Sequence, residues 1–147
     1  CGIGGSALVG KDFSYKLHKL GINAIAEPDG HAQLGIAATF GGDDVVVAIS
    51  ESGGTREIYN AVKEAHTNHA KVISITKYGG TAVSDLADVK LYSVAEDASL
   101  RLSSILARTA QELIIDMLFI ALTQASRSGR KLLEKTNSVV SRFREGD

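Results

Sequence analysis

The sequence lacks the features that give disulfide bonds, structural zinc sites or membrane anchors. It has no tryptophan and one cysteine, Cys1, which excludes an internal disulfide framework and a multi-cysteine zinc site. No uncharged apolar run reaches the roughly 18 residues of a membrane span. Neither charge dominates: 16 Lys and Arg against 17 Asp and Glu give a net charge of -1, so no strong field attracts nucleic acid or anionic lipid. We therefore expect a cytoplasmic protein with no membrane partner, no metal and no cofactor.

Proline is scarce too, with one residue against 15 glycines among 147 residues, and glycines in such numbers are typical of turns between strands and helices. Short β-branched runs alternate with helical patterns along the chain. Strands are predicted at 45–49, 72–76 and 89–93, with weaker ones at 23–26 and 1–3. Helices are predicted at 8–20, 31–39, 57–66, 82–87 and 100–125.

This alternation predicts an α/β fold. The helical segments supply the crossover connections that parallel strands need, and the apolar run at 45–49 is typical of a strand covered on both faces. We expect a three-layer, doubly wound, flavodoxin-like domain with a five-stranded parallel sheet and helices on both faces. With 44% hydrophobic residues, a single domain spanning 1–147 is long enough to build its own core.

The last residues, 128–147, form a basic tail with interleaved apolar residues. Such a tail could contact nucleic acid, or it could form an amphipathic helix that packs on its own domain or on a partner subunit. The acidic residues Glu134, Glu145 and Asp147 dilute its charge and favour the amphipathic helix. The basic residues of the tail are Arg130, Lys131, Lys135, Arg142 and Arg144.

Two Gly- and Ser-rich loops each follow a predicted strand and precede a predicted helix. Ligands of open parallel sheets bind beyond the carboxyl ends of the strands, where such loops lie. The first loop, 2–7, reads Gly-Ile-Gly-Gly-Ser-Ala and matches G-x-G-x-x-A, a form of the dinucleotide fingerprint. Glu27 lies 25 residues after Gly2, close to where a ribose-binding acid would lie. A dinucleotide site is therefore one alternative, and a glycine-rich turn without a ligand is another.

The second loop, 50–55, reads Ser-Glu-Ser-Gly-Gly-Thr and favours a different ligand. It places the hydroxyls of Ser50, Ser52 and Thr55 around two glycines. Glycines let the backbone approach an anion closely, and the free N–H groups at the start of the next helix add donors. A terminal phosphate monoester needs such a loop, whereas a dinucleotide site does not. The alternative is a plain helix cap, for which one hydroxyl would suffice.

Together these motifs resemble the sugar isomerase (SIS) phosphosugar-binding domain over about residues 1–125. Within that family, 11–17 and 133–137 are similar to the effector domain of RpiR/MurR-type transcriptional regulators. The resemblance implies a phosphosugar whose phosphate is held by Ser6, Ser50, Ser52 and Thr55, in loops that include Gly4 and Gly53. The motifs that carry it are G-x-G-x-S at 2–6, S-x-S-G-x-T at 50–55, Ile-Ser-Ile-Thr at 73–76 and Leu-Ala-Asp at 86–88.

The resemblance also implies a role in regulation. We expect a phosphosugar-sensing effector domain of a bacterial transcriptional regulator, for a sugar phosphate of the hexose or amino-sugar 6-phosphate class. Such regulators carry an N-terminal helix-turn-helix domain, so we expect this chain to be a fragment without it, contacting DNA only through that missing domain. A homodimer or higher homo-oligomer is predicted through 100–125 or the tail, because this helix is apolar on more than one face.

Two further residues could act on a bound sugar, which makes an aldose–ketose phosphosugar isomerase the alternative function. His31 is similar to a histidine that some SIS isomerases use for proton transfer, and Glu112 could lie at the mouth of the sugar site. We favour non-catalytic interpretations: a sugar contact for His31, and an ion-pair ladder of Arg108, Glu112 and Asp116. Glu51 is expected to point away from the anion site, because its charge would oppose a phosphate.

Overall fold

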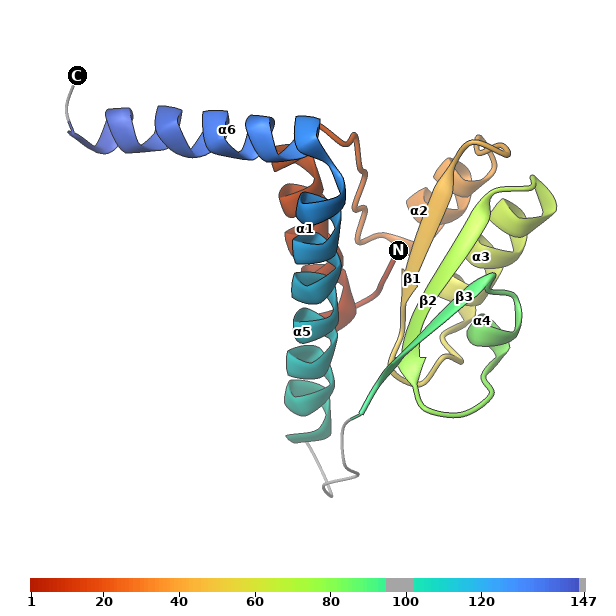
Figure 1. Ribbon diagram of the computed structural model, residues 1–147. Coiled ribbons are helices and arrows are strands. Elements are labelled where there is room, and N and C mark those ends of the chain that lie inside the picture. Colours follow the sequence, from red (N-terminus) through yellow and green to blue (C-terminus); the bar gives the residue numbers. More distant parts are fainter. Residues whose placement is uncertain (95–101, 146–147) are drawn as a thin grey trace.

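The computed structural model describes residues 1–94 and 102–145. The strands form one parallel sheet in the order β1–β2–β3 (Figure 1), which confirms the predicted α/β class. In chain order, the elements are α1 (Gly5–Lys19), α2 (Gly30–Ala37), β1 (Val45–Ile49), α3 (Arg56–Thr67), β2 (Lys71–Lys77), α4 (Ala82–Asp85), β3 (Val89–Ser93), α5 (Leu102–Ala125) and α6 (Arg127–Glu145).

The sheet of the described residues has three strands, so the predicted five-stranded sheet is wrong for this part of the chain. Residues 23–26 form no strand, because side chains of α1 take both main-chain hydrogen bonds of Ala24. The Ser14 hydroxyl donates to the Ala24 carbonyl (2.8 Å), and the Ala24 N–H donates to Nε2 of His18 (3.4 Å). The apolar Ile25 is 67% exposed, so this segment also lacks the burial that a central strand needs.

The other weak strand, predicted at 1–3, is reduced to a single paired residue. The main-chain nitrogen of Cys1 donates to the Val47 carbonyl (2.6 Å), and the Cys1 carbonyl accepts from the Ile49 N–H (2.9 Å). These two bonds are the pattern of a parallel ladder. The chain then turns away into α1, so Cys1 extends the sheet beside β1 without forming a strand of its own.

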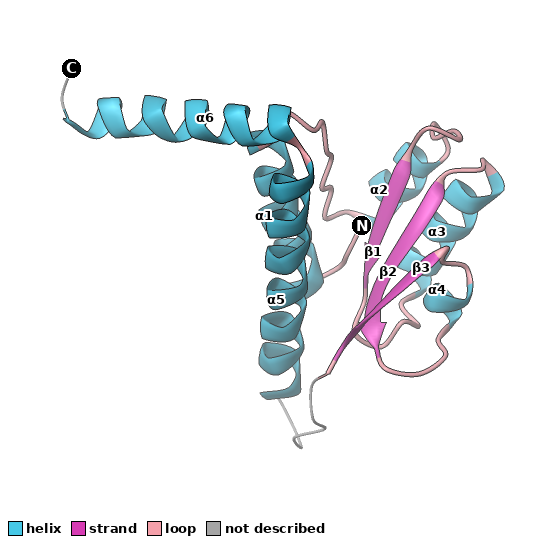
Figure 2. Ribbon diagram, viewed as in Figure 1, coloured by secondary structure: helices cyan, strands magenta, loops and turns pink. Residues whose placement is uncertain are grey.

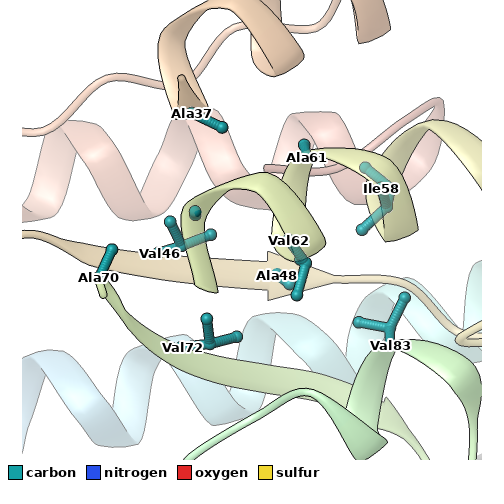
Figure 3. Close-up of a cluster of buried hydrophobic side chains, with 10 residues drawn as sticks. Ala37, Val46, Ala48, Ile58, Ala61, Val62, Ala70, Val72 and Val83 are labelled. Atoms are coloured by element: carbon teal, nitrogen blue, oxygen red, sulfur yellow. The ribbon is translucent and has the colours of Figure 1, made fainter. Parts of the chain in front are cut away.

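Helices cover both faces of the sheet. α2, α3 and α4 lie on one face, and α1 and α5 lie on the other (Figure 1; Figure 2). Alternate residues of β1 serve the two faces: Val46 and Ala48 join one buried cluster, whereas Ile49 joins the other and Val47 packs against it. The first cluster comprises Ala37, Val46, Ala48, Ile58, Ala61, Val62, Ala65, Ala70, Val72 and Val83 (Figure 3). The second comprises Val9, Phe13, Ile49, Ile75 and Ile115.

The basic tail is a helix, α6, which extends away from the sheet (Figure 1). Its first turns contact the domain, where Gly129 is buried close to Leu20. Farther along, the apolar side chains have little cover, and Phe143 is 86% exposed. In the part of the chain that the structure describes, no helix is both long and apolar enough to cross a membrane.

Candidate functional site

The 50–55 loop begins at the edge of the sheet where the strands end. Ser50 directly follows β1 and is 4% exposed. Main-chain hydrogen bonds tie the loop to β2: the Ser50 N–H donates to the Ile75 carbonyl (3.0 Å), and the Lys77 N–H donates to the Glu51 carbonyl (3.0 Å). The loop therefore lies at the edge of the sheet at which open parallel sheets bind ligands.

Gly53 gives the loop its shape. Its φ of 60° lies in the left-handed region, and a Cβ there would lie 2.1 Å from Oγ1 of Thr81, so only glycine fits. The Val83 N–H donates to the Gly53 carbonyl (3.0 Å), which docks the loop on the start of α4. Thr81 is itself held by a capping box with Ser84. The turn at Gly53 is thus fixed by a neighbouring element.

The hydroxyls of the loop do not cap the helix that follows. Thr55 is the N-cap residue of α3, but its side chain accepts no hydrogen bond from the helix; it shares one with the Ser50 hydroxyl instead (3.2 Å). Ser52 is exposed, and among the described residues its hydroxyl accepts a hydrogen bond from the Gly54 N–H (3.2 Å). By contrast, Asp29 caps α2 and Thr81 caps α4 with their side chains. The start of α3 therefore keeps its first-turn N–H groups available to an anion.

The 2–7 loop gives α1 a similar start. Gly4, with a φ of 59°, is the N-cap residue and has no side chain with which to cap the helix. A Cβ on Gly2 would lie 2.7 Å from the Ser6 carbonyl oxygen, so this turn also requires glycine. The side-chain amide of Gln33 donates to the Gly2 carbonyl (2.8 Å) and holds the loop against α2. Both helices that follow the predicted loops thus begin without a side-chain cap.

A buried glutamine of α5 joins the two loops. Gln111 is 1% exposed; its Oε1 accepts from the Ser6 hydroxyl (3.1 Å), and its Nε2 donates to Oε2 of Glu51 (3.4 Å). The Ser93 hydroxyl, at the end of β3, donates to the same Glu51 oxygen (2.7 Å). The Glu51 carboxylate is therefore held by β3 and α5. Gln111 was missed from the sequence, where the one signal is a neutral polar residue in an apolar helix.

Glu112, one residue further on, lies among charged residues of α1 and α5. Burial raises the pKa of the Glu112 carboxyl, and the nearby Asp12 charge raises it further, while Lys16 opposes the shift. Asp116 forms an ion pair with Lys16, which also pairs with Asp12. The predicted ladder along α5 is thus replaced, at Asp116, by a pair between helices. No hydrogen bond of the described residues joins Glu112 to either loop.

His31 lies in the first turn of α2, and its side chain is exposed. A Cβ on the preceding residue, Gly30, would lie 2.8 Å from Cγ of Glu57, in the first turn of α3. The starts of α2 and α3 are therefore neighbours, which places His31 near the 50–55 loop. No hydrogen bond fixes the imidazole within the described part of the chain, so a bound ligand would have to orient it.

Glu27, the acid of the alternative dinucleotide site, forms a hydrogen bond within its own turn. Oε1 of Glu27 accepts from the Asp29 N–H (3.1 Å) in the turn before α2. Residues 1–94 and 102–145 contain no group of three or more His, Cys, Asp or Glu side chains that could hold a metal ion.

The SIS domain model matches residues 1–121, a span that contains both loops and most of α5. The chain belongs to the SIS domain family. The resemblance predicted from the two loops is thereby confirmed.

Solved structures similar to this SIS domain include regulators and isomerases. The Vibrio vulnificus NanR protein, solved in complex with ManNAc-6P, is 25% identical, with a TM-score of 0.87; the match covers 97% of this chain and 55% of that one, so the chain spans about half of NanR. The sugar isomerase domain of an RpiR transcription factor from Sphaerobacter thermophilus is 18% identical (TM-score 0.76; 93% and 75% covered). A phosphoheptose isomerase from Francisella tularensis is 27% identical (TM-score 0.70; 84% and 73% covered).

Proposed function

We propose that this SIS domain is the phosphosugar-sensing effector domain of a bacterial transcriptional regulator. The observation that carries the proposal is the start of α3, where Thr55 leaves the first-turn N–H groups uncapped and the hydroxyls of Ser50 and Ser52 lie in the same loop. The positive end of a helix dipole and its oriented N–H groups favour a phosphate. In this proposal Gly4 and Ser6 complete the phosphate site from the start of α1.

The phosphate site does not itself select a sugar, so the class of ligand depends on the contacts made by the rest of the molecule. The phosphate supplies most of the affinity, and contacts with sugar hydroxyls supply identity; in this proposal His31 is one such contact, and Glu112 borders the site. We propose a hexose or amino-sugar 6-phosphate, which is supported by the ManNAc-6P bound to the similar NanR protein. Ligand binding then shifts a homodimer between two arrangements, and these position helix-turn-helix domains that lie upstream in the full regulator.

A sensor is favoured over an enzyme by the state of the carboxylates. Isomerisation of a sugar phosphate needs a base near C1 and C2. Glu51 accepts hydrogen bonds from Ser93 and Gln111, and Glu112 lies among charged residues of α1 and α5. The Glu51 carboxylate is thus engaged by protein donors, and no hydrogen bond of the described residues joins Glu112 to either loop, which favours binding without turnover.

Calorimetric titration of the chain tests the proposal. Hexose and amino-sugar 6-phosphates should bind, and the matching free sugars should bind far more weakly, because hydrogen bonds to a charged acceptor contribute roughly 1.5–3 kcal/mol each. Equal affinity for a sugar and its phosphate would contradict the proposal.

The isomerase alternative is kept because of the similarity to the Francisella tularensis phosphoheptose isomerase. It predicts exchange of a sugar proton with solvent. Incubating the chain with sugar phosphates in heavy water should give no deuterium at C1 or C2 if the domain is a sensor. Incorporation that disappears in His31→Ala or Glu112→Gln would establish the isomerase instead.

A further inference from the structure

The hydrogen-bond chain through Gln111 has a fixed direction. A carboxylate only accepts hydrogen bonds, so the amide nitrogen of Gln111 must face Glu51 and the amide oxygen must face Ser6. The Ser6 hydroxyl is then the donor to Gln111 (3.1 Å). A serine hydroxyl has one proton. While Ser6 donates it to Gln111, Ser6 cannot donate it to a phosphate.

We propose that Gln111 and the ligand phosphate compete for the Ser6 proton, so that phosphate binding breaks the bond from Ser6 to Gln111 and is thereby sensed by α5. This inference rests on the proposed function, in which Ser6 is a phosphate ligand. A charged phosphate oxygen is a stronger acceptor than a neutral amide, so the Ser6 hydroxyl donates its hydrogen bond to the phosphate instead of to Gln111. Oε1 of Gln111 then loses its donor in a place that water does not reach, since the residue is 1% exposed, and an unpaired buried acceptor is unfavourable.

The position of Gln111 makes α5 the element that responds. Ala107, Gln111 and Ile115 are four residues apart and form a buried stripe on the side of α5 that faces the sheet. Gln111 is the polar member of this stripe, so restoring its hydrogen bond requires a change in how α5 packs. On another side of the helix, Leu113 and Met117 are both 61% exposed. A change at Gln111 therefore reaches the side of α5 that is available to a second subunit.

Met117 offers a direct readout, because it is the single methionine of the chain. With a 13C-labelled methionine methyl group, the NMR spectrum reports α5 through one signal. The probes are inorganic phosphate and glucosamine 6-phosphate. In the wild type, saturation with either probe should shift the Met117 signal. In Gln111→Leu the competing acceptor is gone, so phosphate should bind about three- to tenfold more tightly and the Met117 signal should not move.

Two further variants keep the test decisive. Gln124→Leu makes the same change at an exposed position of α5 and should behave like the wild type. Ser6→Ala removes the shared proton without touching the core of α5; at saturating phosphate it should leave the Met117 signal unmoved, even if Gln111→Leu does not fold.

The outcomes separate this inference from the proposed function. Weaker phosphate binding by Gln111→Leu would mean that Gln111 supports the site or contacts the ligand, and would overturn the competition. A Met117 shift that persists in Gln111→Leu or Ser6→Ala would overturn it as well. Binding by the wild type with a silent Met117 signal rejects the inference alone, whereas a wild type that binds neither probe rejects the proposed function too.

Discussion

Thr55 and Thr81 occupy the same position, immediately before the first turn of a helix, but use their hydroxyls differently. Thr81 accepts a hydrogen bond from the Ser84 N–H (3.1 Å) and so caps α4. Thr55 turns its hydroxyl toward Ser50 and leaves α3 uncapped. A residue that favours capping but does not cap gives up some stability, which is typical of binding sites. The pair allows stability and binding to be separated experimentally.

Thr55→Ala should reduce binding more than stability. Loss of a charge-assisted hydrogen bond predicts about tenfold weaker affinity for a sugar phosphate or more, while the free energy of unfolding should fall by about 0.5 kcal/mol or less, because no cap is lost. Thr81→Ala is the comparison: it should cost about 1 kcal/mol of stability, because a cap is lost, and should weaken the affinity of the folded protein less than Thr55→Ala does, because Thr81 supports the loop only through the turn at Gly53. Urea unfolding and calorimetry measure both quantities. Identical behaviour of the two variants would contradict this view of the α3 start.

Gly53 and Gly54 form a second informative pair. At Gly53, a Cβ would meet Oγ1 of Thr81 at 2.1 Å, on a backbone with a φ of 60°. At Gly54, the nearest atom is Oγ of Ser52, at 4.0 Å. Gly53→Ala should therefore lower the free energy of unfolding by about 1–3 kcal/mol, and Gly54→Ala by about 0.5 kcal/mol or less. Thermal and urea unfolding measure the two losses. Equal losses of stability in the two variants would show that the backbone at Gly53 is not in the left-handed conformation.

At the scale of elements, prediction from sequence succeeds where the residues of a segment themselves determine its secondary structure. The runs at 45–49 and 72–76 are strands in which β-branched residues such as Val46 and Val72 are buried. The run at 89–93 is also a strand, although its one β-branched residue, Val89, is 49% exposed; it pairs in parallel with β2. The strand predicted at 23–26 is wrong because the main-chain groups of Ala24 bond to side chains of α1, those of Ser14 and His18. The same limit applies to the site. The 50–55 loop is readable as a motif, whereas Gln111 contacts Ser6 and Glu51 across 105 and 60 residues of sequence.

Asp88 ties the turn between α4 and β3 to β2. One carboxylate oxygen accepts from the Val72 N–H (2.9 Å), and the other accepts from Nζ of Lys71 (3.0 Å). The hydrogen bond from Val72 and then that from Lys71 lower the pKa of Asp88. When a carboxyl has a lower pKa in the folded state than in the unfolded state, it stabilises the fold at any pH above its unfolded-state pKa. This contribution is lost as the pH falls through the folded-state pKa.

Asp88→Asn should therefore unfold at lower temperature than the wild type at pH 7. The difference should narrow as the pH falls from 3.8, the ordinary pKa of this group, through the lower folded-state pKa, because the folded wild-type carboxyl becomes protonated over that range and loses its charge. Asp85→Asn, in the neighbouring helix, is the control: its side chain is 67% exposed, so the expected effect is small at every pH. Calorimetric melting curves between pH 7 and acid pH provide the measurement. A difference that stays constant with pH would show that charge has no part in the contact.

At the scale of the whole molecule, the unusual feature is apolar surface on two helices. On α5, Leu113, Met117 and Ile120 are each more than half exposed and follow the helical repeat. On α6, Val139 and Val140 are about half exposed, and Phe143 is 86% exposed. Residues 1–94 and 102–145 leave these side chains exposed, and α6 extends away from the sheet (Figure 1). Apolar surfaces of this kind are typical of protein–protein interfaces, which supports the proposed homodimer.

We therefore expect light scattering at tens of micromolar to give twice the 15.5 kDa mass of the chain or more. Leu113→Glu and Phe143→Glu place a charge in the proposed interface, at positions exposed enough for the fold to tolerate it, and at least one of them should yield monomers. The variant that dissociates identifies the helix that forms the contact. Gln124→Glu, at an exposed polar position of α5, should leave the mass unchanged. A wild-type mass of 15.5 kDa at this concentration would contradict the dimer. The proposed shift between two dimer arrangements would then fail as the route by which the proposed phosphosugar effector acts on DNA binding.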